Sequence, residues 1–265
     1  MLYADDSTLV TEADTLEEAI SANTVAIGQA KKWLDANELC LNTNKTVQLV
    51  LTLQKHTAEI DSARFLGVTV DQKMNWVTHG DNLSKRLSRA IFKLRCLSDA
   101  VSPSVLRTAY FEKINPILAY CVIVWGHAAI RHSLFGLQRR AVTVVGGVDY
   151  RDDCRQLFVE LRILSLPCMY ILNCLKHVKT NLHHYYPGAA VHSYDTRCRS
   201  LLHGNMHRLS CSQNGINFWT LKFYNRLPND VKELPLHGFC RHMKPLLLTQ
   251  AFYSWDEYLN FSSFA

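Results

Sequence analysis

The chemistry that this sequence most directly suggests lies at residues 3–6, which read Tyr-Ala-Asp-Asp and place the carboxylates of Asp5 and Asp6 side by side. Carboxylate oxygens are preferred ligands of hard cations such as Mg²⁺. Adjacent aspartates also occur in loops, where they are only solvated. The alternation that includes Leu9 and Val10 predicts an extended segment after the pair. Asp5 and Asp6 are therefore the first candidates for a metal site.

A set of basic side chains on an expected helix over residues 81–97 forms the second candidate site. Apolar residues spaced three or four apart predict its buried face: Leu83, Leu87, Ile91 and Leu94. The outward-facing cations are Lys85, Arg86, Arg89 and Lys93. Such a face can bind a sugar–phosphate backbone, with an affinity that falls as salt rises. The alternative is a charged face that is merely solvated.

A third group has ligand types that suit zinc: Cys198, His203, His207 and Cys211. Its two histidines are one helical turn apart, as a zinc site could require. However, it has no Cys-x-x-Cys pair, and several arginines lie among the ligands, so zinc is the less favoured interpretation. Likewise, Trp219, Phe223 and Tyr224 are more typical of a helix core than of a platform for stacking bases.

The elements expected to position these residues begin with an α+β pattern in the first 75 residues. Thr15 and Glu18 form a capping box that predicts a helix ending near Asn37. Strands are predicted over Val47–Leu53 and Phe65–Val70, and the glycine in the second indicates a bulge or a close backbone approach.

The pattern after residue 78 is helical. Ser102 and Pro103 predict a helix start, and Pro116 predicts a kink. Further helices are predicted over residues 134–145, 151–161, 167–180, 218–226 and 239–248. Residues 181–217 have loop composition, which predicts a domain boundary near residues 181–200.

The composition of the 265 residues is that of a globular protein, with 48% hydrophobic and 20% charged residues. The net charge of +6 is unevenly distributed: −5 over residues 1–78, +7 over residues 79–140 and +4 over the remainder. An acidic segment followed by a basic one is expected where metal ions and a phosphate backbone are bound by neighbouring parts.

Nine cysteines without a repeated short spacing, and no signal peptide, predict reduced thiols in a nuclear or cytoplasmic protein. The longest apolar run, Ile117–Trp125, is about half of the roughly 20 residues that a membrane span needs. We therefore expect no membrane partner.

Taken in order, several segments resemble the C-terminal part of the reverse transcriptase of non-LTR (LINE-type) retrotransposons, nearest the jockey-like clades. Besides the box at residues 3–6, the resemblance rests on Trp33-Leu34, Leu41-Asn42-x-x-Lys45-Thr46, Phe65-Leu66-Gly67-Val68-x-x-Asp71 with Trp76 and His79, Tyr110, Ile114, Pro116, Tyr120, Trp125-Gly126, Leu137-Gln138-Arg139-Arg140-Ala141, Leu164-x-Leu166-Pro167, Tyr194-x-Thr196-Arg197, Phe223-Tyr224-Asn225-Arg226-Leu227-Pro228, Ala251-Phe252-Tyr253-Ser254 and Glu257-Tyr258-Leu259. Their order, rather than any single box after the first, makes the likeness specific.

The resemblance implies an α+β fold: a truncated polymerase palm remnant of short antiparallel strands plus a helix over residues 1–78. A mostly α-helical thumb and connection would follow over residues 79–180, and the C-terminal tail region over residues 181–265. The implied activity is RNA-directed DNA synthesis from an RNA template, a DNA primer and dNTPs, with Mg²⁺ as cofactor.

Specific roles follow from the same resemblance. Asp5 would bind Mg²⁺ directly with Asp6 as helper, in a two-metal mechanism with ions roughly 4 Å apart. Lys45 would protonate the pyrophosphate; the alternative is a solvated turn lysine. Tyr3 would support the primer end, or be an ordinary strand aromatic. The segment that grips the primer would be Phe65, Leu66 and Gly67.

The family's palm also uses a carboxylate from a strand before the box, and this sequence begins two residues before the box. We therefore expect the 265-residue chain by itself to be catalytically inactive, because electrostatic stabilisation is usually the largest catalytic contribution. Two alternatives remain: a non-catalytic nucleic-acid-binding module, or a degenerate remnant whose exposed apolar palm surface favours aggregation.

Overall fold

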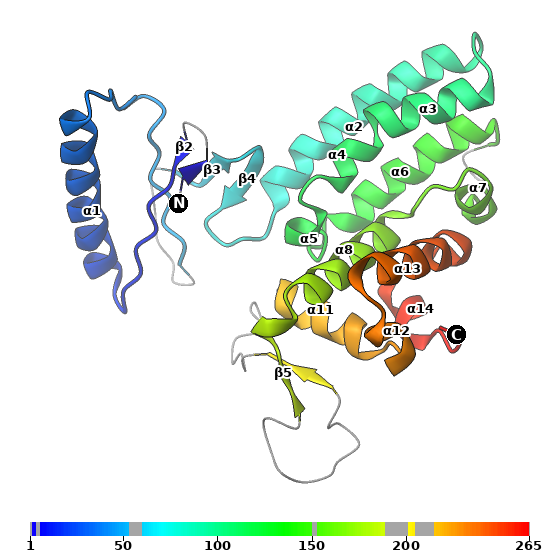
Figure 1. Ribbon diagram of the computed structural model, residues 1–265. Helices are drawn as coiled ribbons and strands as arrows, with labels where there is room; N and C mark the ends of the chain where they lie inside the picture. Colours follow the sequence, from blue (N-terminus) through cyan, green and yellow to red (C-terminus); the bar gives the residue numbers. More distant parts are fainter. Residues whose placement is uncertain are drawn as a thin grey trace. The chain divides into compact units, whose positions relative to one another are not determined.

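The computed structural model describes residues 2–3, 6–52, 60–149, 153–188, 201–204 and 215–264 (Figure 1). The chain divides into two compact units, residues 1–74 and residues 75–265. We refer to them as the N-terminal unit and the helical unit, and each is described by itself.

The N-terminal unit contains one helix and two antiparallel hairpins. Its elements are β1 (Leu2–Tyr3), β2 (Asp6–Ser7), α1 (Leu16–Ala36), β3 (Ser62–Phe65) and β4 (Val68–Asp71). One of the two hydrogen bonds of the predicted capping box is confirmed: the Glu18 N–H donates to Thr15 Oγ1 at 3.3 Å. No residue of α1 is buried, so the apolar stripe of this helix contributes little to the core of the unit.

The predicted strand over Val47–Leu53 is wrong for its described part, because residues 46–52 belong to no strand. A β-branched run becomes a strand only when a neighbouring strand hydrogen-bonds to its backbone. No strand among the described residues pairs with this run. Val47 and Leu51 are accordingly half exposed, at 51% and 50%.

The helical unit is built almost entirely of helices (Figure 1). Its elements are α2 (Val77–Ser98), α3 (Pro103–Lys113), α4 (Asn115–Ala119), α5 (Val122–Trp125), α6 (Arg131–Gly146), α7 (Arg155–Glu160), α8 (Leu166–Thr180), the 3-10 helix η1 (Leu182–His184), β5 (Tyr186–Pro187), β6 (Leu202–His203), α11 (Ile216–Asn225), α12 (Asn229–Glu233), α13 (Leu236–Gln250) and α14 (Trp255–Asn260). The predicted break at Pro116 is confirmed, because α3 ends at Lys113 and Pro116 lies in the first turn of α4. The fold is thus α+β, mainly helical, with short antiparallel hairpins.

The centre of the helical unit is α8, which packs against α5, α6, α11 and α13. Its side chains are buried around nearly the whole helix, as expected for a helix that is apolar on all sides. Helices on both sides of the predicted boundary near residues 181–200 therefore share one core. The assignment of separate thumb and tail regions stays a prediction.

The seven described cysteines are all free thiols. Burial raises the pKa of the Cys168 thiol to about 12 and that of Cys174 further still. These thiols are protonated at neutral pH and act as small apolar core residues. Within the described part of the chain, no helix is both long and apolar enough to cross a bilayer.

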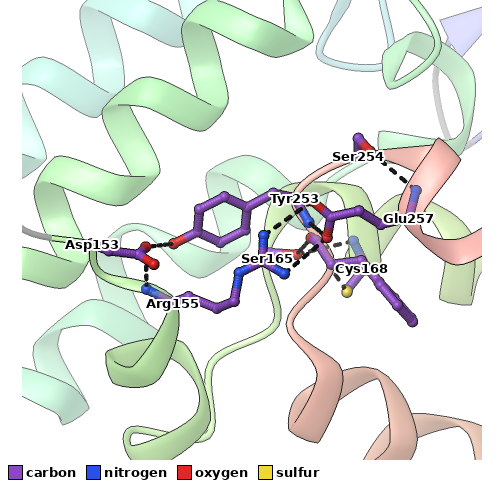
Figure 2. A network of polar contacts seen from close by, with 8 residues as sticks. Asp153, Arg155, Ser165, Cys168, Tyr253, Ser254 and Glu257 are labelled. Carbon is purple, nitrogen blue, oxygen red and sulfur yellow. Dashed lines mark hydrogen bonds and ion pairs between the residues drawn. The ribbon is translucent and has the colours of Figure 1, made fainter. Parts of the chain in front are cut away.

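A polar clasp, made by Arg155, Tyr253 and Glu257, holds the C-terminal segment against α7 (Figure 2). The Arg155 guanidinium donates two hydrogen bonds of 3.0 Å to the Glu257 carboxylate, and the Tyr253 N–H donates a third, also 3.0 Å. Ser165 Oγ donates to the Phe252 carbonyl at 2.5 Å, which joins the same segment to the start of α8. The clasp therefore connects residues about a hundred positions apart in sequence.

The clasp predicts a pH-dependent contribution to stability. Burial raises the pKa of Glu257, but the hydrogen bonds from Arg155 and Tyr253 and the charge of Arg155 lower it to a net value below the ordinary one. The carboxylate therefore stabilises the fold above its unfolded pKa of about 4.3, and this contribution disappears as pH falls through the folded pKa. Because both side chains are more than a third exposed, solvent screening limits the contribution to about 1 kcal/mol.

We expect Glu257→Gln to lower the free energy of unfolding by about 1 kcal/mol at pH 7. The difference from the unsubstituted chain should shrink steadily below about pH 4.3. Urea denaturation at a series of pH values measures both quantities. A constant difference across that range would show that the charge of Glu257 is unimportant. The matched control is Glu233→Gln, at an exposed position of α12.

Candidate functional site

The carboxylates singled out by the sequence lie on a short hairpin. In this antiparallel pair Leu2 faces Ser7 and Tyr3 faces Asp6, so only Ala4 and Asp5 connect the strands. Asp6 is exposed. Asp5 lies outside the described residues, as does the side chain of Tyr3. The roles of Tyr3, Asp5 and Asp6 stay predictions.

A magnesium site needs several oxygen ligands gathered together. Asp6 is one exposed carboxylate of the right type, but the described residues contain no cluster of three or more histidine, cysteine or acidic side chains. The described donor set therefore does not by itself fit a catalytic magnesium site. For this reason we assign no metal site to the described residues alone.

Lys45 lies in an exposed turn of the N-terminal unit. Its backbone N–H donates to the Asn42 carbonyl at 3.2 Å and to Asn42 Oδ1 at 3.3 Å. Asparagine commonly stabilises turns in this way, so the local sequence explains the backbone at Lys45. The side chain is exposed, which suits both a solvated lysine and the predicted role as a general acid.

The predicted primer-gripping segment is a β-hairpin turn, and the interpretation of Phe65–Val70 as one bulged strand is wrong. Phe65 pairs with Val68 across the hairpin, and the two residues between them, Leu66 and Gly67, have φ values of 46° and 84°. Two consecutive positive φ angles suit the tight turn that connects twisted strands. Glycine adopts such an angle without steric cost, so its position is explained by the turn. A role of Phe65, Leu66 and Gly67 in primer binding stays a prediction.

Two residues of the same motif, Trp76 and His79, belong to the core of the helical unit. Trp76 precedes the first turn of α2 with φ 64°, and its side chain is 6% exposed. His79 is 3% exposed, with its ring centroid 6.1 Å from that of Trp125. Burial, together with the nearby charge of Arg86, lowers the pKa of His79, so its ring is neutral at pH 7. These residues fix where α2 begins and thereby orient its charged face.

The predicted faces of α2 are confirmed. The apolar residues Leu83, Leu87, Ile91 and Leu94 are buried, at 0–4% exposure. The candidate nucleic-acid ligands are all exposed: Lys85, Arg86, Arg89 and Lys93. Because α2 packs against α3 and α6, the cations are held on a rigid helix rather than on a loop.

Few acidic residues accompany these cations: the acidic residue of α2 is Asp81, four residues before Lys85. The ion pairs within the described residues join Lys113 to Glu112 and Arg155 to Glu257, and neither involves α2. Residues 82–98 contain no aspartate or glutamate, and α6 contains none either. Two adjacent helices therefore present a positive surface, which attracts polyanions.

The structure describes one of the four residues of the possible zinc group. His203 lies in β6 opposite Tyr186, whereas Cys198, His207 and Cys211 lie outside the described residues. Of the aromatic residues of α11, Phe223 and Tyr224 are buried, at 0% and 3% exposure, which confirms the expectation of core residues for these two.

The sequence interpretation missed one exposed aromatic residue. Phe92 lies within the basic stretch of α2 and is 68% exposed. Phe92 follows Lys85 by seven residues and Arg89 by three. Because residues at these spacings share one face of a helix, the sequence predicts that Phe92 lies among the cations. The signal that could have identified Phe92 was an aromatic residue at a position of the otherwise polar face of α2.

Comparison with known proteins gives distant relatives. Neither a family model nor a solved structure matches the chain significantly. A "Probable RNA-directed DNA polymerase from transposon BS" of Drosophila melanogaster is 26% identical over 166 residues, covering 56% of this chain and 18% of the relative. A "Putative 115 kDa protein in type-1 retrotransposable element R1DM" of the same organism is 26% identical over 192 residues, covering 67% of this chain and 16% of the relative. The chain thus spans less than a fifth of the length of either relative.

Proposed function

We propose that this chain, which is related to the reverse transcriptases of non-LTR retrotransposons, is a nucleic-acid-binding part of such an enzyme. In the whole protein it would take part in RNA-directed DNA synthesis on a DNA primer, with dNTPs as substrates. We assign residues 1–78 to the palm, residues 79–180 to the helical thumb and connection, and residues 181–265 to the tail region. A nuclear or cytoplasmic location accords with the free thiols.

The single observation that supports binding best is the uncompensated basic surface of α2. Five exposed cations, Lys85, Arg86, Arg89, Lys93 and Arg95, lie on a helix whose opposite face is buried in the core. No acidic residue follows Asp81 on α2, and none is present on α6. Contacts between cations and phosphates provide most of the affinity of nucleic-acid binding and depend little on sequence. Template–primer backbone is therefore the ligand that we assign to this surface.

For catalysis we propose a role only in the whole protein. Asp5 and Asp6 would contribute magnesium ligands beside carboxylates from other parts of the polypeptide, and Lys45 would act near the leaving group. The hairpin register that places Asp6 opposite Tyr3 supports this assignment. Within the 265-residue chain, binding of nucleic acid without primer extension is the behaviour that the described donor set supports.

Replacing Lys85 and Arg89 together by glutamine tests the binding surface. We expect the affinity for a labelled RNA–DNA hybrid to fall by about 10- to 100-fold at low salt, since two phosphate contacts are lost. The slope of log K against log salt concentration should become shallower by about 1.5–2. Fluorescence anisotropy over a series of KCl concentrations measures both.

The matched control replaces Arg241 and Lys244, two exposed cations of α13, by glutamine. This pair removes the same charge from a different surface, so it should leave the salt slope within about half a unit of the original. If both pairs change binding equally, net charge rather than the α2 surface determines affinity, and the assignment is refuted.

A further inference from the structure

A groove runs along the surface of the helical unit between α2 and α6. Two residues of α2 and four of α6 line it: Ser84, Ser88, Ser133, Gly136, Leu137 and Arg140. The two helices pack against each other. Four of the six lining residues are small: Ser84, Ser88, Ser133 and Gly136.

Gly136 lines the groove with open space beside its Cα atom. A Cβ atom built on this glycine would meet no other atom within 4 Å. Packed helix axes are about 8–10 Å apart, so the valley between two helices is narrow and can accommodate no more than one sugar–phosphate backbone. A duplex carries two backbones and can touch only the edges of such a groove.

The lining and edges suit a phosphodiester. Serine hydroxyls and arginine N–H groups are common donors to phosphate oxygens. Arg140 contributes its guanidinium from α6, and Lys85 and Arg89 follow the lining serines of α2 by one residue. Neither helix wall supplies an acidic side chain between residues 82 and 98 or between residues 131 and 146.

Phe92 adds a contact that a phosphate-binding surface does not need. It lies one helical turn beyond Ser88, with Arg89 and Arg95 three residues away on either side, and its ring is 68% exposed. Aromatic rings beside cations bind unpaired bases by stacking, at about 1–3 kcal/mol per base. Paired bases in a duplex do not offer their faces to such a ring.

We propose that the α2–α6 groove, together with Phe92, is a binding site for single-stranded nucleic acid. One backbone lies over Gly136 between Arg140 and the serines of α2, and an unpaired base stacks on Phe92. This inference rests on the proposed function and makes it more specific, because it adds a preference for an unpaired strand over a duplex.

The test compares two labelled probes by fluorescence anisotropy: an oligo(dT) of about 12 nucleotides and a duplex of the same length. Gly136→Leu fills the groove at a position with free space, so the chain should fold normally. We expect it to weaken oligo(dT) binding at least about tenfold and duplex binding less than about twofold. Phe92→Ala should weaken oligo(dT) binding by about 5- to 150-fold.

Gly28→Leu on α1 is the matched control, since a Cβ atom there also meets nothing within 4 Å. Circular dichroism confirms that each variant is folded. If the unsubstituted chain binds both probes but Gly136→Leu binds oligo(dT) unchanged, the groove assignment is overturned and the proposed function stands. A preference of the unsubstituted chain for the duplex likewise overturns the groove alone. If it shows no salt-dependent binding of either probe, both proposals fail.

Discussion

Replacing Gln138 by leucine is expected to lower the free energy of unfolding by roughly 2–5 kcal/mol. Gln138 is completely buried on α6. Its Nε2 group donates to Tyr110 Oη and to the Leu164 carbonyl, both at 2.9 Å. Its Oε1 accepts from the Leu166 N–H at 2.7 Å. One amide therefore joins α3, α6 and the start of α8.

The physical reason is that leucine keeps approximately the volume but removes every hydrogen bond. The Leu166 N–H and the Leu164 carbonyl would then remain in an apolar interior without these partners, at about 1–3 kcal/mol each. Since a domain is stable by only about 5–15 kcal/mol, this single change would remove a large fraction of the total.

Urea denaturation followed by tryptophan fluorescence measures this loss, since four of the five tryptophans belong to the helical unit. A fall in the midpoint of about 1–2 M is expected. Gln156→Leu on the exposed side of α7 is the control and should change stability by less than about 0.5 kcal/mol. Equal midpoints for Gln138→Leu and the unsubstituted chain would show that the amide network is not needed.

Gly126→Ala is expected to destabilise the helical unit by about 1–3 kcal/mol, through overpacking. A Cβ atom on Gly126 would lie 2.5 Å from Tyr170 Cδ2 and 2.5 Å from the Val122 carbonyl oxygen. The Tyr170 ring is itself fixed by stacking on Trp255, with centroids 5.2 Å apart. Neither the ring nor the backbone carbonyl can move away without disturbing the core. This close approach is the reason why a residue without a Cβ atom follows Trp125.

Thermal or urea denaturation measures this effect, and Gly136→Ala provides a control of opposite sign. The space above Gly136 is open, so alanine there should stabilise α6 by roughly 0.5–1 kcal/mol through its better helix propensity. Combining Gly126→Ala with Tyr170→Leu should recover part of the loss relative to the sum of the single changes. Strict additivity of the two substitutions would contradict a direct clash.

Much of the helical part of this protein was predictable from the sequence, because helical order is local. Apolar residues at three- and four-residue spacing identified the buried face of α2, and Pro116 located the break between α3 and α4. Thr15 located the start of α1 through its side-chain cap. In each case the determining interactions lie within four residues of one another in the chain.

The strands were less predictable, because a strand depends on its partner. Val47–Leu53 has strand composition, yet its described part has no partner strand. The glycine at position 67 indicated an unusual backbone, but only the pairing of Phe65 with Val68 revealed a turn instead of a bulge. Composition restricts the backbone angles that a residue can adopt, whereas pairing selects among them.

The sequence by itself determined the chemical types of the candidate site: adjacent carboxylates, a basic helix and the family resemblance built on ordered motifs. Only the tertiary structure decided how the basic helix can act. Packing of α6 against α2 created the groove at Gly136 and placed Arg140 beside the serines of α2. Burial of one face left Phe92 exposed among the cations. These features arise from contacts between helices some 50 residues apart in sequence, which no local pattern encodes.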